Sequence, residues 1–83
     1  MHKVILSKKV SKELEKIPKL YYIKVIEVLK SLESDPYVGK RLKGEFSQLF
    51  VIRAWPYRIV YEIYKNELIV QIIKINHRKD VYK

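Results

Sequence analysis

Three apolar segments joined by very short links dominate the second half of this chain. They are LFVIRA, YRIVYEIY and LIVQIIKI, at residues 49–54, 57–64 and 68–75. Apolar and polar side chains alternate along the middle segment, which is typical of a strand with one buried face. Only KNE, a hairpin-length link, separates the last two segments, so we predict that they pair as antiparallel strands.

Helical periodicity replaces this alternation in the first half. After a short apolar strand candidate at residues 2–7, Ser7 is placed to cap a helix whose apolar residues recur at i, i+4 and i+7. Pro18 ends this helix, because the residue before a proline avoids the α region. A second helix is predicted over residues 19–34. Its apolar stripe is predicted to comprise Tyr22, Ile26, Leu29 and Leu32, widened by Ile23 and Val25.

The element order β-α-α-β-β-β predicts an α+β fold, in which a helical hairpin packs on one face of a small, mainly antiparallel sheet. Eighty-three residues leave no room for a second core, so residues 1–83 are predicted to form a single domain. The other face of the sheet is expected to meet water or a ligand. The residues predicted to be mainly buried are Leu14, Ile26, Leu29, Ile59, Tyr61, Val70 and Ile72.

Composition argues against several classes of protein. With no cysteine and only two histidines, the chain has no disulfide, no thiolate zinc site and too few histidines for an all-histidine metal site. It has no glycine-rich phosphate loop and no HExxH motif, and its acidic residues are scattered, so we expect neither a metal nor a cofactor. Apolar runs too short to span a membrane, and an N-terminus unlike a signal peptide, predict a cytoplasmic protein.

The net charge of +9 is uneven, because residues 40–83 carry ten basic and only four acidic side chains. A basic surface attracts phosphate backbones or acidic proteins, although lysine-rich surfaces also serve solubility alone. The basic residues of this half that we take as candidates for nucleic-acid binding are Lys40, Arg41, Lys43, Arg53, Lys74, Lys79 and Lys83.

Arg58 is conspicuous because it lies near the start of the middle strand. Counting outward from the KNE link, Arg58 lies opposite residues 74–76 of the last strand, which brings it toward Arg78. Like charges placed together cost energy unless an anion joins them, so this convergence predicts a phosphate site. The alternative is that Arg58 is a solvated charge on the edge of the sheet.

Three further side chains have open roles. His77 is either a structural histidine or a base. Tyr82 is placed to pack its ring over the sheet near the C-terminus. Trp55 stands at the corner before a proline, where it can pack over the core, touch a partner or stack on a base, in that order of preference.

Several short patterns occur together along the chain. The helical region ends in L-x-x-D-P, LKG precedes the strands, R-x-x-x-Y-R-I-V-Y-E-I spans the corner, and H-R-x-x-V-Y-K closes the sequence. In this order and spacing, they resemble the RelE/ParE superfamily of toxins from toxin–antitoxin pairs. The resemblance covers essentially the whole chain.

The compact length and the HRKDVYK ending are more similar to the RelE branch, whose toxins cleave messenger RNA in the ribosomal A site, than to the gyrase-inhibiting ParE branch. The resemblance implies that Arg58 and Arg78 bind phosphate and stabilise the transition state, with Tyr82 in proton transfer or base stacking. His77 is a further candidate for proton transfer. A DNA gyrase inhibitor and a non-catalytic basic nucleic-acid-binding module remain as alternatives.

The resemblance also implies partners. The expected ones are the ribosome with its messenger RNA, and an acidic RelB-like antitoxin that silences the toxin in a hetero-oligomer. A basic chain with a small core suits an acidic partner that wraps around it.

Overall fold

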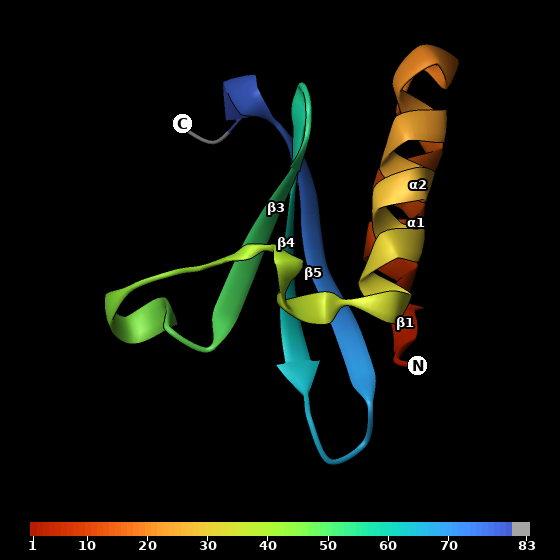
Figure 1. The fold of residues 1–83 in the computed structure, drawn as a ribbon. Helices are drawn as coiled ribbons and strands as arrows, with labels where there is room; N and C mark the ends of the chain where they lie inside the picture. The colour runs from red at the N-terminus through yellow and green to blue at the C-terminus, as the bar shows by residue number, and fades with distance from the viewer. Residues whose placement is uncertain (81–83) are drawn as a thin grey trace.

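The computed structural model describes residues 1–80 and shows a five-stranded sheet with both α-helices on one face (Figure 1). The sheet order is β1-β5-β4-β3-β2, and only the pairing of β1 with β5 is parallel. The elements are β1 (Lys3–Leu6), α1 (Lys8–Glu15), α2 (Lys19–Ser34), η1 (Pro36–Val38), β2 (Lys40–Arg41), η2 (Gly44–Phe46), β3 (Leu49–Ala54), β4 (Tyr57–Tyr64), β5 (Ile69–His77) and η3 (Arg78–Asp80), where η denotes a short 3₁₀ helix. The predicted α+β class is confirmed.

Most predicted boundaries are confirmed, and two differ. β3 and β4 occupy the predicted segments, and β4 pairs antiparallel with β5. β5 continues to His77, two residues further than predicted, because Tyr57 and Arg58 at the start of β4 give its last residues a partner. β2 lies in a stretch where we predict only a connector, since two residues are too few to show an alternating pattern.

Local chemistry explains where the helices begin and end. The backbone N–H of Val10 donates to Ser7 Oγ at 3.2 Å, so Ser7 caps α1 as predicted. α1 ends at Glu15 and α2 begins at Lys19, on either side of the predicted break at Pro18. None of the helices within residues 1–80 is long and apolar enough to span a membrane.

The buried face of α2 is only part of the predicted stripe. Val25, Leu29 and Leu32 are buried as predicted, whereas Tyr22 and Ile23 are exposed. Apolar side chains surround most of α2, so two stripes satisfy helical spacing and periodicity alone does not choose between them. Packing against the sheet selects the stripe centred on Val25 and Leu29.

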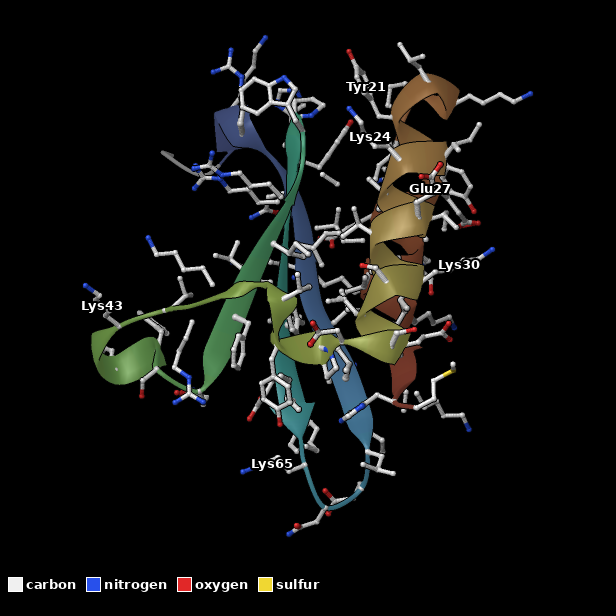
Figure 2. The ribbon with its side chains drawn as sticks, in the orientation of Figure 1. Tyr21, Lys24, Glu27, Lys30, Lys43 and Lys65 are labelled. Atoms are coloured by element: carbon white, nitrogen blue, oxygen red, sulfur yellow. The ribbon has the colours of Figure 1, made fainter. Side chains whose placement is uncertain are left out.

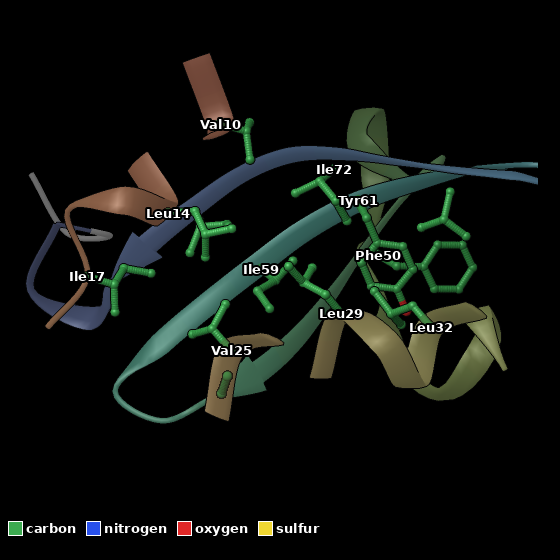
Figure 3. Close-up of a cluster of buried hydrophobic side chains, with 13 residues drawn as sticks. Val10, Leu14, Ile17, Val25, Leu29, Leu32, Phe50, Ile59, Tyr61 and Ile72 are labelled. Atoms are coloured by element: carbon green, nitrogen blue, oxygen red, sulfur yellow. The ribbon is translucent and has the colours of Figure 1, made fainter. Parts of the chain in front are cut away.

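The core lies between the two helices and the helix-facing side of the sheet (Figure 3). Six of the seven residues predicted to be buried are buried, and only Ile26 is merely half-buried. Ile59 and Tyr61 are fully buried on β4. Because side chains alternate along a strand, their burial directs Arg58 and Val60 to the opposite face, which we call the open face.

The Tyr61 hydroxyl ties the segment before β2 to the centre of the sheet. It donates to the carbonyl oxygen of Pro36 at 2.7 Å and accepts from the backbone N–H of Gly39 at 3.1 Å. A Cβ atom on residue 39 would collide with this hydroxyl, so the close approach requires glycine. The Phe50 ring stacks on Tyr61, with ring centroids 5.5 Å apart. The start of β2 is thereby held against the sheet.

We predict that Tyr61→Phe lowers the free energy of unfolding by about 1–3 kcal/mol, because it leaves the Pro36 carbonyl and the Gly39 N–H without their partner. Urea denaturation measures this difference. Tyr64→Phe is the matched control, since Tyr64 is exposed and its hydroxyl donates to Glu62 in a solvent-exposed hydrogen bond. A loss from Tyr61→Phe no larger than that from Tyr64→Phe would contradict the role given to Tyr61.

Burial also raises the pKa of Tyr61 above its ordinary value of 10.0, and the charge of Asp35 adds to this, while the Gly39 hydrogen bond opposes it. The unfolded state therefore loses this proton at lower pH than the folded state. The resulting stabilisation is complete below about pH 10 and disappears as the pH rises above that value. Urea denaturation between about pH 8 and 11 should show a steeper loss in the wild type than in Tyr61→Phe. Parallel losses would contradict this prediction.

Candidate functional site

Two arginines face each other on the open face of the sheet. Arg53 on β3 lies directly opposite Arg58 on β4, and Asn76 of β5 lies on the other side of Arg58. Directly opposed residues in an antiparallel pair have Cβ atoms about 5 Å apart, so both arginine side chains start from neighbouring positions on the open face. Arg53 is exposed and Arg58 is half-buried.

A second row of residues crosses the open face one step away. Lys40 of β2 pairs with Val51, Val51 pairs with Val60, and Val60 pairs with Lys74 of β5. Lys40 and Lys74 therefore flank the apolar pair Val51 and Val60, next to the two arginines. We call Lys40, Arg53, Arg58 and Lys74 the open-face basic patch.

Part of this patch lines a groove of about 650 Å³. One wall is the segment from Val38 to Lys43, which projects from the sheet on the side away from the helices, with Lys43 near its tip (Figure 2). The floor includes Val51, Arg53 and Arg58. A concave, basic surface lined by two directly opposed arginines suits a phosphate group, because arginine binds phosphate oxygens through two parallel hydrogen bonds.

Within residues 1–79, Lys40, Arg53, Arg58 and Lys74 form no ion pair with an acidic side chain. A bound anion therefore relieves the repulsion between these like charges. Their clustering on one face of the sheet favours an anion-binding site.

Arg78 contacts the corner of the β3–β4 hairpin, next to the position of the two opposed arginines. Its backbone N–H donates to the carbonyl oxygen of Pro56 at 2.8 Å, and its guanidinium carbon lies 5.1 Å above the Trp55 ring. The β3–β4 corner and η3 lie at the same end of the sheet (Figure 1). The predicted register is confirmed, since Arg58 pairs with Asn76, two residues before Arg78. Trp55 is 57% exposed, so the expectation that it packs over the core is wrong.

Other predicted residues lie elsewhere. Arg41 pairs with the buried Phe50, and its guanidinium carbon is 5.2 Å from the centroid of that ring, toward the helix-facing side. Lys79 is exposed in η3. Tyr82 and Lys83 lie outside the described residues, so their roles stay predictions.

His77 does not share a face with Arg58. It pairs with Tyr57 on the helix-facing side, where the two rings meet edge to face with centroids 5.2 Å apart. Its Nδ1 accepts a hydrogen bond from the backbone N–H of Lys79 at 3.1 Å. The nitrogen that carries the lone pair is therefore already engaged, and the role of His77 as a base stays a prediction.

The opposition of Arg53 and Arg58 is the feature that our sequence reasoning misses. We count the register only from the KNE link, which relates Arg58 to β5. The two residues Trp55 and Pro56 form an equally short link, and counting outward from it pairs residue 54 with 57 and residue 53 with 58. The signal was therefore present in the sequence.

A sequence model of the family described as "ParE toxin of type II toxin-antitoxin system, parDE" matches residues 4–82. The chain thus belongs to the RelE/ParE superfamily of type II toxin–antitoxin toxins. The predicted family is confirmed.

The individual relatives are RelE-type toxins. Toxin RelG of Mycobacterium tuberculosis is 32% identical over 74 residues, which cover 87% of this chain and 85% of RelG. A chain of the toxin–antitoxin complex RelBE2 from the same organism matches with a TM-score of 0.84 and 29% identity, over 93% of this chain and 98% of that one. A chain of the archaeal RelE–RelB complex from Pyrococcus horikoshii OT3 matches with a TM-score of 0.76 and 25% identity, over 93% and 94%. The RelE-like fold is confirmed.

We predict that Arg58→Gln leaves the free energy of unfolding unchanged or raises it by up to about 1 kcal/mol, because it removes a like charge directly opposite Arg53. Inorganic phosphate should raise the melting temperature of the wild type more than that of the variant, since a ligand that binds only the folded state stabilises it. Thermal denaturation with and without phosphate measures both effects. A clearly destabilised variant, or an equal response to phosphate, would contradict the site.

Proposed function

We propose that this toxin is a ribosome-dependent endoribonuclease that cleaves messenger RNA in the A site without a metal ion. The observation that carries the proposal is the open-face basic patch, in which Arg53 and Arg58 lie directly opposed with no acidic partner among residues 1–79. The similarity to RelG and to the chain of RelBE2 supports the RelE branch.

The proposed chemistry begins with the 2′-hydroxyl of the nucleotide before the scissile bond. A base removes its proton, the 2′-oxygen attacks phosphorus, and the bond from phosphorus to the 5′-oxygen breaks as that oxygen takes up a proton. Arg58 and Arg78 neutralise the pentacoordinate phosphorane, because guanidinium groups stay charged and bind phosphate oxygens in pairs. Arg53, opposite Arg58, shares this task.

The other candidates hold the substrate or move protons. Lys40, Lys74, Lys79 and Lys83 contact the RNA backbone, with Arg41 and Lys43 from the segment that walls the groove. Tyr82 and His77 are the candidates for proton transfer. A tyrosine is a weak base at neutral pH, so positioning supplies much of the rate, and the ribosome provides it by holding the messenger RNA.

An acidic RelB-like antitoxin is the proposed silencing partner. The complexes from Mycobacterium tuberculosis and Pyrococcus horikoshii each pair a toxin with an antitoxin. The net charge of +9 on this chain favours an acidic partner by long-range attraction. Co-expression and pull-down with the small acidic protein encoded alongside should yield a tight complex.

Inhibition of DNA gyrase is a second candidate, because the matching family model carries the ParE description. We predict that expression of the chain arrests translation and leaves messenger RNA cut at A-site codons, with DNA supercoiling unchanged. Primer extension on cellular RNA and gel analysis of plasmid topology make the comparison. Gyrase-dependent DNA damage with intact messenger RNA would contradict the proposal and favour the ParE activity.

We further predict that Arg58→Ala lowers the cleavage rate of ribosome-bound messenger RNA by about 10²–10³, the scale for one lost transition-state donor. Arg58→Lys should rescue only partly, because a point charge does not reproduce the two-pronged guanidinium. The double variant with Arg78→Ala should lose less than the two single losses combined if both residues act on one phosphate.

Lys30→Ala is the matched control for this experiment. Lys30 is exposed on α2 and projects away from the sheet (Figure 2), and its loss also removes one positive charge. Its cleavage rate should equal that of the wild type. A well-folded Arg58→Ala protein with full activity would refute the role of Arg58.

A further inference from the structure

An exposed indole stands at the end of the hairpin that carries the opposed arginines. Trp55 is the single tryptophan of the chain and is 57% exposed. It belongs to the two-residue link between β3 and β4, two residues after Arg53 and three before Arg58. At about 3.3 Å per residue, the indole is attached about 7 Å along the strand from the phosphate-binding pair, which is on the scale of one nucleotide.

The surroundings of Trp55 hold the indole and leave much of it open. The hydrogen bond from the Arg78 backbone N–H to the Pro56 carbonyl fastens η3 to the corner. The Arg78 guanidinium then lies over the indole, 5.1 Å from its centroid. A planar ring covered by a cation on one face and still more than half exposed presents a flat surface to a second planar group.

The position of this ring favours one kind of occupant. A single exposed apolar side chain is common on protein surfaces and needs no explanation by itself. This one, however, combines an aromatic face, a stacked guanidinium and an adjacent, unneutralised phosphate site. Aromatic rings beside a basic groove bind unpaired bases by stacking, with little dependence on which base is present.

We propose that Trp55, with Arg78 on one face, is a stacking platform for an unpaired base of single-stranded RNA, next to the phosphate that Arg53 and Arg58 bind. The proposal rests on the proposed function for the identity of the ligand as RNA. It assigns to Arg78 a positioning role as well, since its guanidinium supports the indole.

The test uses the fluorescence of Trp55, which reports on this one position because the chain has no other tryptophan. The intact toxin is titrated with a short single-stranded RNA and with an abasic oligonucleotide of the same length and charge. Fluorescence anisotropy of labelled oligonucleotides measures binding independently. The RNA should quench the indole strongly, whereas the abasic oligonucleotide should bind with little quenching.

Two variants separate stacking from charge. Trp55→Ala should weaken RNA binding by about 5- to 150-fold, while its affinity for the abasic oligonucleotide and the salt dependence stay as in the wild type. Arg58→Gln should weaken binding of both oligonucleotides and reduce the salt slope by about one unit.

The alternative outcomes are distinct. If RNA binds without quenching and Trp55→Ala binds it as tightly as the wild type, the stacking platform is refuted and the phosphate site stands. If neither oligonucleotide binds the wild type, the RNA-binding basis of the proposed function fails, and the platform fails with it. If Trp55→Ala weakens only the complex with the acidic antitoxin, the indole belongs to a protein interface and the platform is refuted.

Discussion

The buried hydroxyl of Tyr61 is the interaction on which the arrangement of the site depends. Through its hydrogen bonds to Pro36 and Gly39, it holds the segment that follows α2 against β4, in the middle of the sheet. Lys40 follows Gly39 directly and therefore enters β2 opposite Val51. Beyond this anchor, the segment that walls the groove is held to β3 by the two-residue strand β2, by the Leu42 N–H, which donates to the Leu49 carbonyl oxygen, and by the contact of Arg41 with Phe50. One polar group in the core thus positions a cation on the far face of the sheet.

The side chains of β4 point alternately to the two faces of the sheet. Ile59 and Tyr61 fill the core on the helix-facing side, while Arg58 and Val60 lie on the open face. The helices cover only one side of the sheet (Figure 1), so the opposite side keeps its charges in contact with solvent. Repulsion between Arg53 and Arg58 lowers the stability of the fold slightly, and an anion that binds between them relieves this repulsion.

The sequence predicts those features that depend on local chemistry. Ser7, Pro18 and the alternation of β4 each act through neighbours in the chain, so the cap, the helix break and the strand are all correct. Features that depend on contacts between distant parts of the chain cannot be predicted in this way. The buried face of α2 depends on which side meets the sheet, β2 exists only because β3 lies beside it, and the packing of Arg78 on Trp55 depends on η3 folding back to Pro56. For the site, the sequence supplies candidate cations, but their grouping on one face needs the sheet register.

RNA binding to the open face through the basic patch can be tested by methyl NMR during titration with a short single-stranded RNA. The methyl signals of Val51 and Val60, which lie between Lys40 and Lys74, should shift on binding. The signals of Val10 and Val25, whose side chains are buried between the helices and the sheet, should stay unchanged. Shifts confined to residues around the lysines of α1, with Val51 and Val60 unaffected, would contradict binding at the open face.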